Sequence, residues 1–542
     1  MNYPKFLGGI IVASTAEGVV FVRKASGLTR AVSGWDALIY ATVNPGILHC
    51  MNYIIWGPAL YPGSDMPVAV LLVFMMFPIA GLYVLMSISM PRSGGEYIYV
   101  SRIISPMWGL LACWTLTIIG ISWGGVLTNW TVNWGLGYIF LNNGLASGNT
   151  VLTDIGLALN NDILLIFGVG SIVLALSFYA IYRGVRTFIY VCWAEFFIAI
   201  AGLIAYAVAC FSAGPSVFQA RLLSVAGINY TNDLLLPAQS LGWTPGYSLL
   251  ATIACGATYV NLNTLGNTYT TNMAGEIKNV TRAQPLAVIG SLCMLMVFWE
   301  VMYGSSWVGT GGEFWGIIST LDWAGIQPFG VHPSPAHIVL YMTSNPVILT
   351  LVPLGFMASA HSGAIGLPFG PIRNLFAWSF DGILPNAINK VNRKGSPYAA
   401  VLLGAAMAYT FFLLNTFTDV LYYINYAITT WFIGWLIVGV AGILFPYRQN
   451  AIFRKSPSIV QIKLGKIPLV TVLGALTAGI SAYIVYASIL PVVAGGYTEA
   501  IYLLTTVAFL CVTPIVLYYV ATWYRRRQGI PIDLRFKDIP PD

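Results

Sequence analysis

The stretch YATVNPGILHCMNY, Tyr40–Tyr53, decides the fold because it places Pro45 and Gly46 inside a segment long and apolar enough to cross a membrane as a helix. Proline removes a backbone hydrogen-bond donor and clashes with the preceding turn, and glycine adds conformational freedom. Lipid offers no partner for the backbone groups that such an interruption releases. The stretch therefore predicts a discontinuous helix whose break is surrounded by protein or by a water-filled cavity.

The rest of the chain has the composition of a membrane protein. Of its 542 residues, 58% are hydrophobic and 8% are charged, whereas ordinary soluble domains carry about 25% charged residues. A scan for apolar windows of about 20 residues predicts twelve membrane-spanning helices. They lie at residues 35–59, 67–90, 105–140, 162–182, 187–212, 247–275, 285–309, 346–372, 397–415, 418–446, 468–492 and 499–524. We expect an all-α polytopic membrane protein.

The distribution of basic residues supports this count. If the amino terminus is cytoplasmic, every one of the 25 Lys and Arg residues except Arg221 falls in a segment predicted to lie inside, as the positive-inside rule requires. A missed or extra span would reverse every later loop. We therefore expect twelve spans in the cell membrane with both termini in the cytoplasm. The same bias accounts for the net charge of +7 without a nucleic-acid partner.

A second predicted span is also interrupted. Residues 247–275 begin apolar and then become rich in Asn and Thr, with Gly266 near the middle. Two broken helices five spans apart predict an inverted repeat, because an odd number of spans reverses the direction of crossing. The expected organisation is a cytoplasmic extension (1–34), a first five-helix repeat (35–212), an extracellular loop (213–246), an inverted five-helix repeat (247–446), two extra helices (447–524) and a cytoplasmic tail (525–542).

The two breaks are candidate binding sites. The amides of Gly46 and Ile47, at the start of the second half of the first span, form a positive dipole end that suits a carboxylate. Carbonyl groups released before the breaks suit an ammonium group, and they lie around Val43, Asn44, Asn261 and Asn263. Together these groups would hold the backbone of an amino acid. The alternative is a proline kink and a polar seam between helices with no ligand, and the matching second break favours the binding site.

Three loop motifs resemble signatures of the amino acid-polyamine-organocation superfamily. PRSGGEYIYVSR (91–102) resembles its PxSGGxYxY motif, MAGEIKNVTRAQPLAV (273–288) its AEExKNPxxxxPxA motif, and PIRNLFAWSFDGILP (371–385) its SRxLxAxxxDGxLP motif. They occur in the order found in that superfamily, and the resemblance covers about residues 20–542. It implies a secondary transporter of amino acids or related amines, with ten core helices in two inverted halves.

The resemblance also implies binding residues. By position, the superfamily's GSGI break falls on Asn44, Pro45, Gly46 and Ile47, and its FxGF break falls on Thr264, Leu265, Gly266 and Asn267. Asn44 and Pro45 are bulkier than the residues they replace, and Thr264 and Asn267 stand at aromatic positions. We therefore expect a pocket wall that is more polar than usual, which argues against large apolar substrates.

Ionisable residues inside the predicted spans are candidates for ion coupling, because such residues are rare and usually functional. They are Glu195, Glu300 and His361. Glu195 lies near the place where members of the resembled superfamily hold sodium or a lysine that replaces it, and pairing with His361 or Ser362 would allow proton exchange near neutral pH. The alternatives are a protonated carboxyl bonded to a helix backbone for Glu195 and a packing role for His361 and His49. Glu300 is the weaker candidate and could line the outer vestibule.

These observations predict secondary active transport of amino acids or related amines by alternating access, with proton symport as the expected coupling. An ion-independent exchanger is the main alternative, and a nutrient sensor or channel of the same fold is a further one. We do not expect an enzyme, because the sequence has no HExxH and no clustered His and Cys, and its GxSxG match, GISWG (120–124), lies inside a predicted span, where we expect it to pack against a neighbouring helix. No cofactor or metal is expected. The expected partners are a small-molecule substrate, the lipid bilayer, and a proton or sodium ion.

Overall fold

The computed structural model describes residues 28, 30–495, 497–530, 532 and 536, together with three strands nearer the amino terminus. Residues 1–5, 8–9, 16–17, 23–27 and 29 of the predicted extension 1–34, and most of the predicted tail 525–542 after residue 530, lie outside the described residues. The strands are β1 (Phe6–Leu7), β2 (Ile10–Thr15) and β3 (Gly18–Val22), which pair antiparallel in that order, and β4 (Lys463–Leu464) with β5 (Ile467–Pro468), which form a second antiparallel pair.

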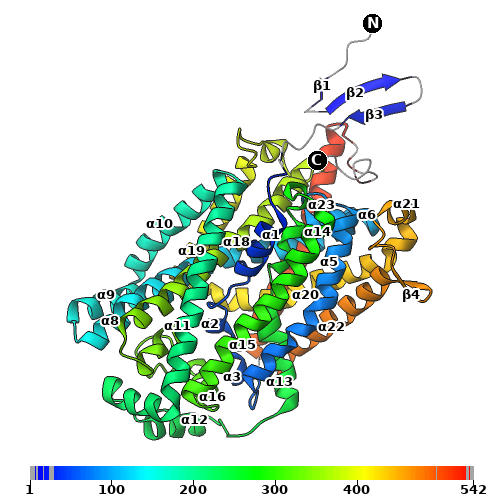
Figure 1. The fold of residues 1–542 in the computed structure, drawn as a ribbon. Helices are drawn as coiled ribbons and strands as arrows, with labels where there is room; N and C mark the ends of the chain where they lie inside the picture. The colour runs from blue at the N-terminus through cyan, green and yellow to red at the C-terminus, as the bar shows by residue number, and fades with distance from the viewer. Residues whose placement is uncertain are drawn as a thin grey trace.

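Helices make up most of the fold (Figure 1). The first α-helices are α1 (Gly34–Val43), α2 (Met51–Ile54), α3 (Gly57–Leu60), α4 (Met66–Val70), α5 (Phe77–Ser89), α6 (Gly95–Ile103), α7 (Pro106–Trp130), α8 (Tyr138–Ser147), α9 (Thr150–Asn161), α10 (Ile163–Tyr182), α11 (Val185–Ala226) and α12 (Leu236–Ser240). The remaining α-helices are α13 (Leu249–Cys255), α14 (Val280–Gln284), α15 (Gly290–Thr310), α16 (Phe314–Trp323), α17 (Pro335–Ile338), α18 (Pro346–Phe380), α19 (Tyr398–Phe417), α20 (Val420–Arg448), α21 (Asn450–Lys455), α22 (Leu469–Gly495) and α23 (Tyr497–Arg527).

Short helices of other types continue or connect these α-helices. The 3-10 helices are η1 (Leu71–Met76), η5 (Asn267–Thr271), η6 (Ala274–Glu276), η8 (Val339–Tyr341) and η9 (Asn386–Asn389). The π-helices are η2 (Thr131–Gly137), η3 (Tyr230–Leu235), η4 (Gly256–Val260) and η7 (Pro285–Ile289).

Ten helical segments in the described part of the chain are long and apolar enough to cross a membrane. Each overlaps one of the predicted spans, and the prediction of a helical polytopic membrane protein is confirmed. Three of them run well past their predicted ends, and one of these is α18, which continues to Phe380 instead of ending at residue 372. The third span continues through η2 and α8 to Ser147, and α11 continues to Ala226 across a kink at Gly214 (φ 71°), next to Pro215. Part of the segment predicted as the loop 213–246 is therefore helical.

The two remaining predicted spans are interrupted. In the first, α1 ends at Val43 and α2 begins at Met51, and Gly46 between them has a φ of 99°. In the second, η4 ends at Val260 and η5 follows Gly266, whose φ is 95°. Both glycines occupy the left-handed region that other residues adopt only with strain. The backbone is thus non-helical at both places where the sequence predicts a break.

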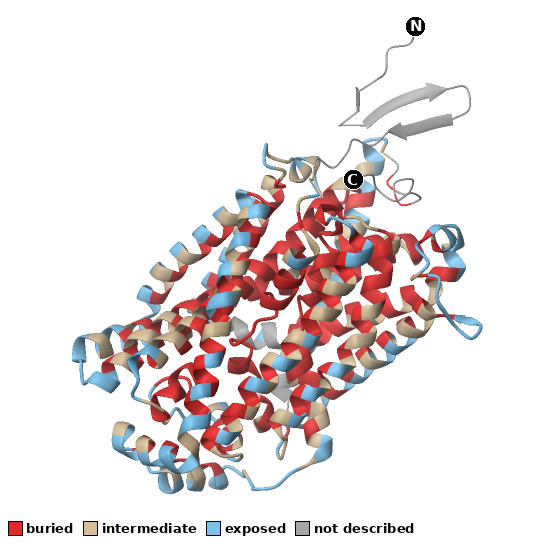
Figure 2. Cartoon of the chain, in the orientation of Figure 1, coloured by how far each residue is buried: buried red, intermediate tan, exposed pale blue. Residues whose placement is uncertain are grey.

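The centre of the bundle is formed by α18, which packs between α7 and α11. Figure 2 shows that buried residues fill this centre and that exposed ones lie on the outside of the bundle. Large exposed hydrophobic residues recur on the outer helices α10, α22 and α23, as expected for surfaces that face lipid. Close helix packing depends on small residues: a Cβ added at Gly202 of α11 would lie 2.7 Å from the Cα of Gly355 in α18.

The bundle has two ends, which we name by the helices found there. In Figure 1, α6 and α21 lie at one end, the α6 end, and α12 and α16 lie at the other, the α16 end. The broken segments between α1 and α2 and between η4 and η5 lie in the interior, since every residue from Asn44 to Cys50 is buried, and so is every residue of 261–266 except Asn263.

Candidate functional site

Carbonyl groups at the first break accept hydrogen bonds from neighbouring helices. The Ser362 hydroxyl of α18 donates to the Val43 carbonyl (2.9 Å), and the Trp299 indole of α15 donates to the Gly46 carbonyl (3.0 Å). Side chains therefore replace the intrahelical partners that the break removes. The predicted coupling residue Ser362 faces this break.

The amides after the break are only partly satisfied. The Ser359 hydroxyl oxygen accepts from the amides of Leu48 (2.9 Å) and His49 (3.2 Å). The amides of Gly46 and Ile47 have no hydrogen-bond partner among the described residues, although both residues are buried. Buried backbone donors are nearly always paired with protein, water or a ligand. These two amides are the ones that the sequence predicts to hold a carboxylate.

The second break lies against the first. The Asn44 side-chain amide donates to the Gly266 carbonyl (2.8 Å), while its oxygen has no partner within the described chain. Asn261 is fully buried, and neither polar atom of its side chain has a partner in that same part of the chain. Leaving a buried amide unpaired costs about 1–3 kcal/mol. The region therefore carries the polar groups of a site that a ligand or water completes.

A small cavity of about 30 Å³ adjoins both breaks. Pro45 and His49 line it from the first break, and Leu262, Asn263 and Leu265 line it from the second. The rest of its wall is aliphatic and aromatic, and the rings come from Tyr53, Trp123, Trp130 and Trp431. A volume of this size holds a water molecule but not an amino acid. The space beside the breaks is thus nearly closed in this conformation.

Two predicted binding residues point elsewhere. The Thr264 hydroxyl donates to the Asn261 carbonyl (2.7 Å), and the Asn267 side chain donates to the Val288 carbonyl (3.2 Å). Neither residue lines the cavity. The polar wall that we expected from these two side chains is absent from the described cavity, whose rings make it largely aromatic.

Glu195 and His361 are brought together, as their predicted pairing requires. Glu195 Oε1 is hydrogen-bonded to His361 Nδ1, and His361 Nε2 lies 2.9 Å from the Ser177 hydroxyl. The three residues come from α11, α18 and α10. The Ser177 hydroxyl donates its own proton to the Val173 carbonyl (2.8 Å), so its oxygen accepts from His361 Nε2. One proton is therefore shared between His361 Nδ1 and the Glu195 carboxyl.

Ser362, His49 and Glu300, the other residues considered for ion coupling or packing, lie apart from this pair. Ser362 is bonded to the first break instead, so it does not join Glu195. His49 contacts the Ser359 hydroxyl (3.1 Å) and lines the small cavity. Glu300 is only partly buried in α15 and lines neither of the cavities described in this article.

Charged residues of the three loop motifs meet at the α6 end. Arg373 forms an ion pair with Glu276 (2.8 Å), and Arg102 forms one with Asp381 (2.8 Å). The Glu96 carboxylate accepts from the side-chain amide of Asn272, which also donates to Asn374 (2.7 Å). All of these residues are buried. We call Glu96, Arg102, Asn272, Glu276, Arg373, Asn374 and Asp381 the buried charge network. The sequence alone did not lead us to predict this network, although the charged residues within the three motifs could have indicated it.

At the α16 end, α16 and the following loop contact the segment after the first break. The Trp56 indole donates to Asp322 (2.6 Å), and His332 Nδ1 lies 3.5 Å from the same carboxylate. The Ser319 hydroxyl accepts from the Ala59 amide (2.9 Å). Burial raises the pKa of Asp322, but hydrogen bonds from His332 and Trp56 outweigh burial and hold the pKa below its usual 3.8.

This lowered pKa predicts an acid-sensitive contact. The Asp322 carboxylate stabilises the folded chain above about pH 4, and its contribution is lost as the pH falls through the lowered folded pKa. We expect the thermal stability of the purified protein to fall below about pH 4 more steeply than that of Asp322→Asn. Asp154→Asn, at an exposed position of α9, is the control and should follow the wild type. Parallel acid profiles for the wild type and Asp322→Asn would contradict the assignment.

A family model described as "Amino acid permease" matches residues 56–535. The chain belongs to the amino acid permease family. The permease is also 28% identical over 244 residues to the uncharacterized amino acid permease YvbW of Bacillus subtilis (strain 168). That similarity covers 43% of the permease and about half, 48%, of YvbW. The amino acid permease family comprises multi-pass membrane transporters and not enzymes. The ten long apolar helices in the described part of the chain agree with this membership.

Proposed function

We propose that the permease moves amino acids across the cell membrane by alternating access and that the two breaks hold the substrate backbone. The observation that carries the proposal is the contact between Asn44 and Gly266, which joins the breaks beside the unpaired amides of Gly46 and Ile47. Those amides would bind the carboxylate. The unpaired oxygens of Asn44 and Asn261 would accept from the ammonium group.

The proposed architecture has twelve spans. The ten long helices, together with the broken segments α1–α3 and α13–η5, account for that number. Spans one to five and six to ten would form two inverted repeats, followed by α22 and α23, which places a broken helix first in each repeat. The basic loops at the α6 end support a cytoplasmic location for that end and for both termini. The buried charge network would then close the inner side.

We propose proton symport as the coupling mode. The proton shared by Glu195 and His361 lies inside the membrane, where a change of charge is costly. Ser359 and Ser362, on the same turn of α18 as His361, bond to the first break. A change in the protonation of the Glu195–His361 pair would therefore affect the hydrogen bonds at the first break, because His361 shares a turn of α18 with Ser359 and Ser362. Ion-independent exchange is the rival, and it has no need of this pair.

Reconstituted transport tests the proposed function. We expect purified permease in liposomes to take up one or more amino acids saturably, and an inward proton gradient to drive accumulation more than a sodium gradient does. Counterflow without any gradient, with no response to pH, would favour an exchanger. Absence of saturable uptake across a panel of amino acids and amines would overturn the proposal.

Gly46→Ala is expected to weaken substrate binding. A Cβ at Gly46 would lie 2.1 Å from a carbon of the His49 ring, and the φ of 99° strains any other residue. The free protein would relieve such strain, which costs on the order of 1–3 kcal/mol, by turning the amides of Gly46 and Ile47 away from the substrate, so the substrate Kd should rise roughly tenfold or more. Gly168→Ala is the matched control, because a Cβ there meets nothing within 4 Å. Equal Kd values for the two variants would argue against a substrate at the first break.

A further inference from the structure

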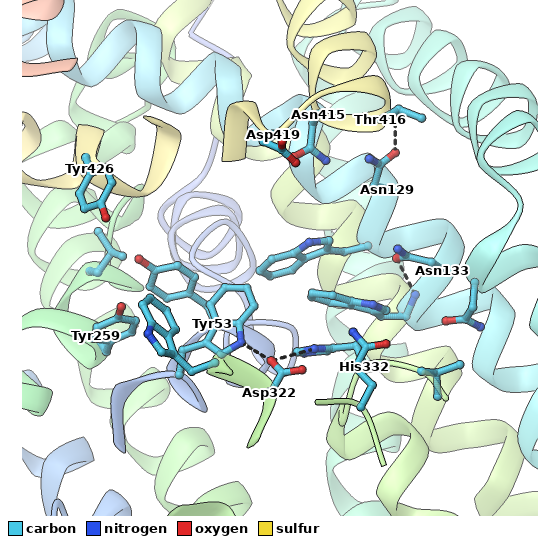
Figure 3. Close-up of a pocket in the computed structure, with 18 of the residues that line it drawn as sticks. Tyr53, Asn129, Asn133, Tyr259, Asp322, His332, Asn415, Thr416, Asp419 and Tyr426 are labelled. Carbon is cyan, nitrogen blue, oxygen red and sulfur yellow. Dashed lines mark hydrogen bonds and ion pairs between the residues drawn. The ribbon is translucent and has the colours of Figure 1, made fainter. Parts of the chain in front are cut away.

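A larger cavity of about 750 Å³ lies at the α16 end of the permease. Tyr53, Trp130 and Leu262 line both this cavity and the small one beside the breaks, so the two adjoin. Figure 3 shows side chains from several helices converging on the larger space. Unlike the small cavity, it has room for a whole amine or amino acid.

Aromatic rings form a continuous series along one wall. Tyr259 stacks on Tyr53 with ring centroids 5.1 Å apart. Tyr53 and Trp56 pack edge to face with ring centroids 5.5 Å apart. Trp56 and Trp134 each contact the His332 ring, at 5.8 and 4.1 Å. The faces of such rings carry partial negative charge and attract organic cations.

The charged groups of the wall have one sign. Asp322 and Asp419 line the cavity, and no Lys or Arg does so within the described chain. Figure 3 places the two carboxylates apart, with Asp322 beside His332 and Asp419 near Asn415. Asp322 is bonded to Trp56, whereas Asp419, which precedes α20, is exposed and has no hydrogen bond or ion pair with any described residue. Asp419 is thus the carboxylate available to a ligand.

Amide side chains add further acceptors to the cavity wall. Asn129, Asn133 and Asn415 line the same cavity. An amide oxygen accepts hydrogen bonds from a primary ammonium group, and the ring faces suit a methylated one. An anion would find two carboxylates and neither Lys nor Arg among the described wall residues, and the one histidine there, His332, is paired with Asp322, so the cavity opposes acidic ligands.

We propose that this cavity is a second binding site, separate from the breaks, that takes the ammonium group of an organic amine. Asp419 supplies the counter-charge and the ring series supplies the cation–π contacts. This inference rests on the proposed function in one respect: a site on the way to the breaks would favour substrates that carry an amine over acidic ones. Binding at the cavity itself does not require transport.

Choline and its uncharged isostere 3,3-dimethyl-1-butanol test the proposal, because they share a shape and differ in charge. Choline has no carboxylate for the Gly46 and Ile47 amides. Tryptophan fluorescence of the purified permease in nanodiscs should report saturable choline binding, with the isostere roughly tenfold weaker. Asp419→Asn and Trp134→Leu should each weaken choline roughly tenfold. Asp154→Asn, which lies outside the cavity, and Gly46→Ala should leave choline binding unchanged.

The outcomes separate this proposal from the proposed function. Equal affinity for choline and the isostere, or choline binding unchanged in Asp419→Asn, would overturn the second site. Loss of choline binding in Gly46→Ala would place the ligand at the breaks and would also overturn it. Selective choline binding without amino acid uptake would instead contradict the proposed function, and uptake without selective choline binding would contradict the second site alone.

Discussion

Glu195→Gln is expected to abolish proton-driven accumulation while substrate exchange continues. Glutamine keeps the size of the side chain and can still hydrogen-bond to His361, but it cannot release a proton. We expect accumulation under an inward proton gradient to fall about 100-fold, which corresponds to about 2.7 kcal/mol. Counterflow of labelled substrate, which needs no net proton movement, should remain close to wild type.

Glu300→Gln is the matched control for this experiment. Glu300 is also a carboxyl within a predicted span, but it lines neither cavity and has no contact with His361. Its replacement should leave both activities unchanged. If Glu195→Gln still accumulates substrate in response to a pH gradient, the pair has no part in coupling. If counterflow is lost as well, the residue acts in binding or folding instead.

Arg373→Met is expected to destabilise the permease by about 3–5 kcal/mol, because it leaves the Glu276 carboxylate buried without its ion-pair partner. The Arg373 guanidinium also lies 3.6 Å from the centroid of the Phe369 ring. Adding Glu276→Leu should restore most of the stability, since removing both charges avoids the desolvation cost. Arg454→Met, at an exposed position of α21, should change stability by less than about 0.5 kcal/mol. Thermal unfolding in detergent measures all three effects.

The double variant also tests whether the buried charge network closes the inner side. Cys113, on α7, is fully buried, and its sulfur lies 3.6 Å from the Thr117 hydroxyl, which accepts from Asn374 of the network. If the network holds the inner side shut, Arg373→Met with Glu276→Leu should let a thiol reagent reach Cys113 from that side. Peptide mass spectrometry would locate the label. Unchanged protection of Cys113 would limit the network to a structural role.

The spans and breaks were predictable because they depend on local rules. Apolar length sets the helices, and the combination of Pro45 with Gly46 in one segment, and Gly266 among Asn and Thr in the other, disfavours a continuous helix. The meeting of Glu195 and His361 was also predictable, since buried ionisable groups need partners. These predictions rest on composition and on the cost of polar groups in lipid, and both can be assessed from the sequence alone.

Side-chain directions at the second break could not be predicted in the same way. A one-residue change in helical phase turns a side chain by about 100°, and the π-helix η4 shifts that phase just before Thr264 and Asn267. The partners at the first break come from distant helices, as Ser359 and Trp299 illustrate. The ion pairs of the buried charge network join helices that are far apart in sequence, α6 and η6 with the end of α18, so tertiary packing decides them.

The close approach of Gly202 and Gly355 has a mechanical consequence. Glu195 lies two helical turns from Gly202, and His361 lies less than two turns from Gly355, so the pair sits beside a contact where the backbones of α11 and α18 touch. Helices seated this closely resist sliding past one another. The Glu195–His361 pair would then move with α11 and α18 as one rigid unit. The part that changes conformation would be the segment between α1 and α2, which contains Gly46.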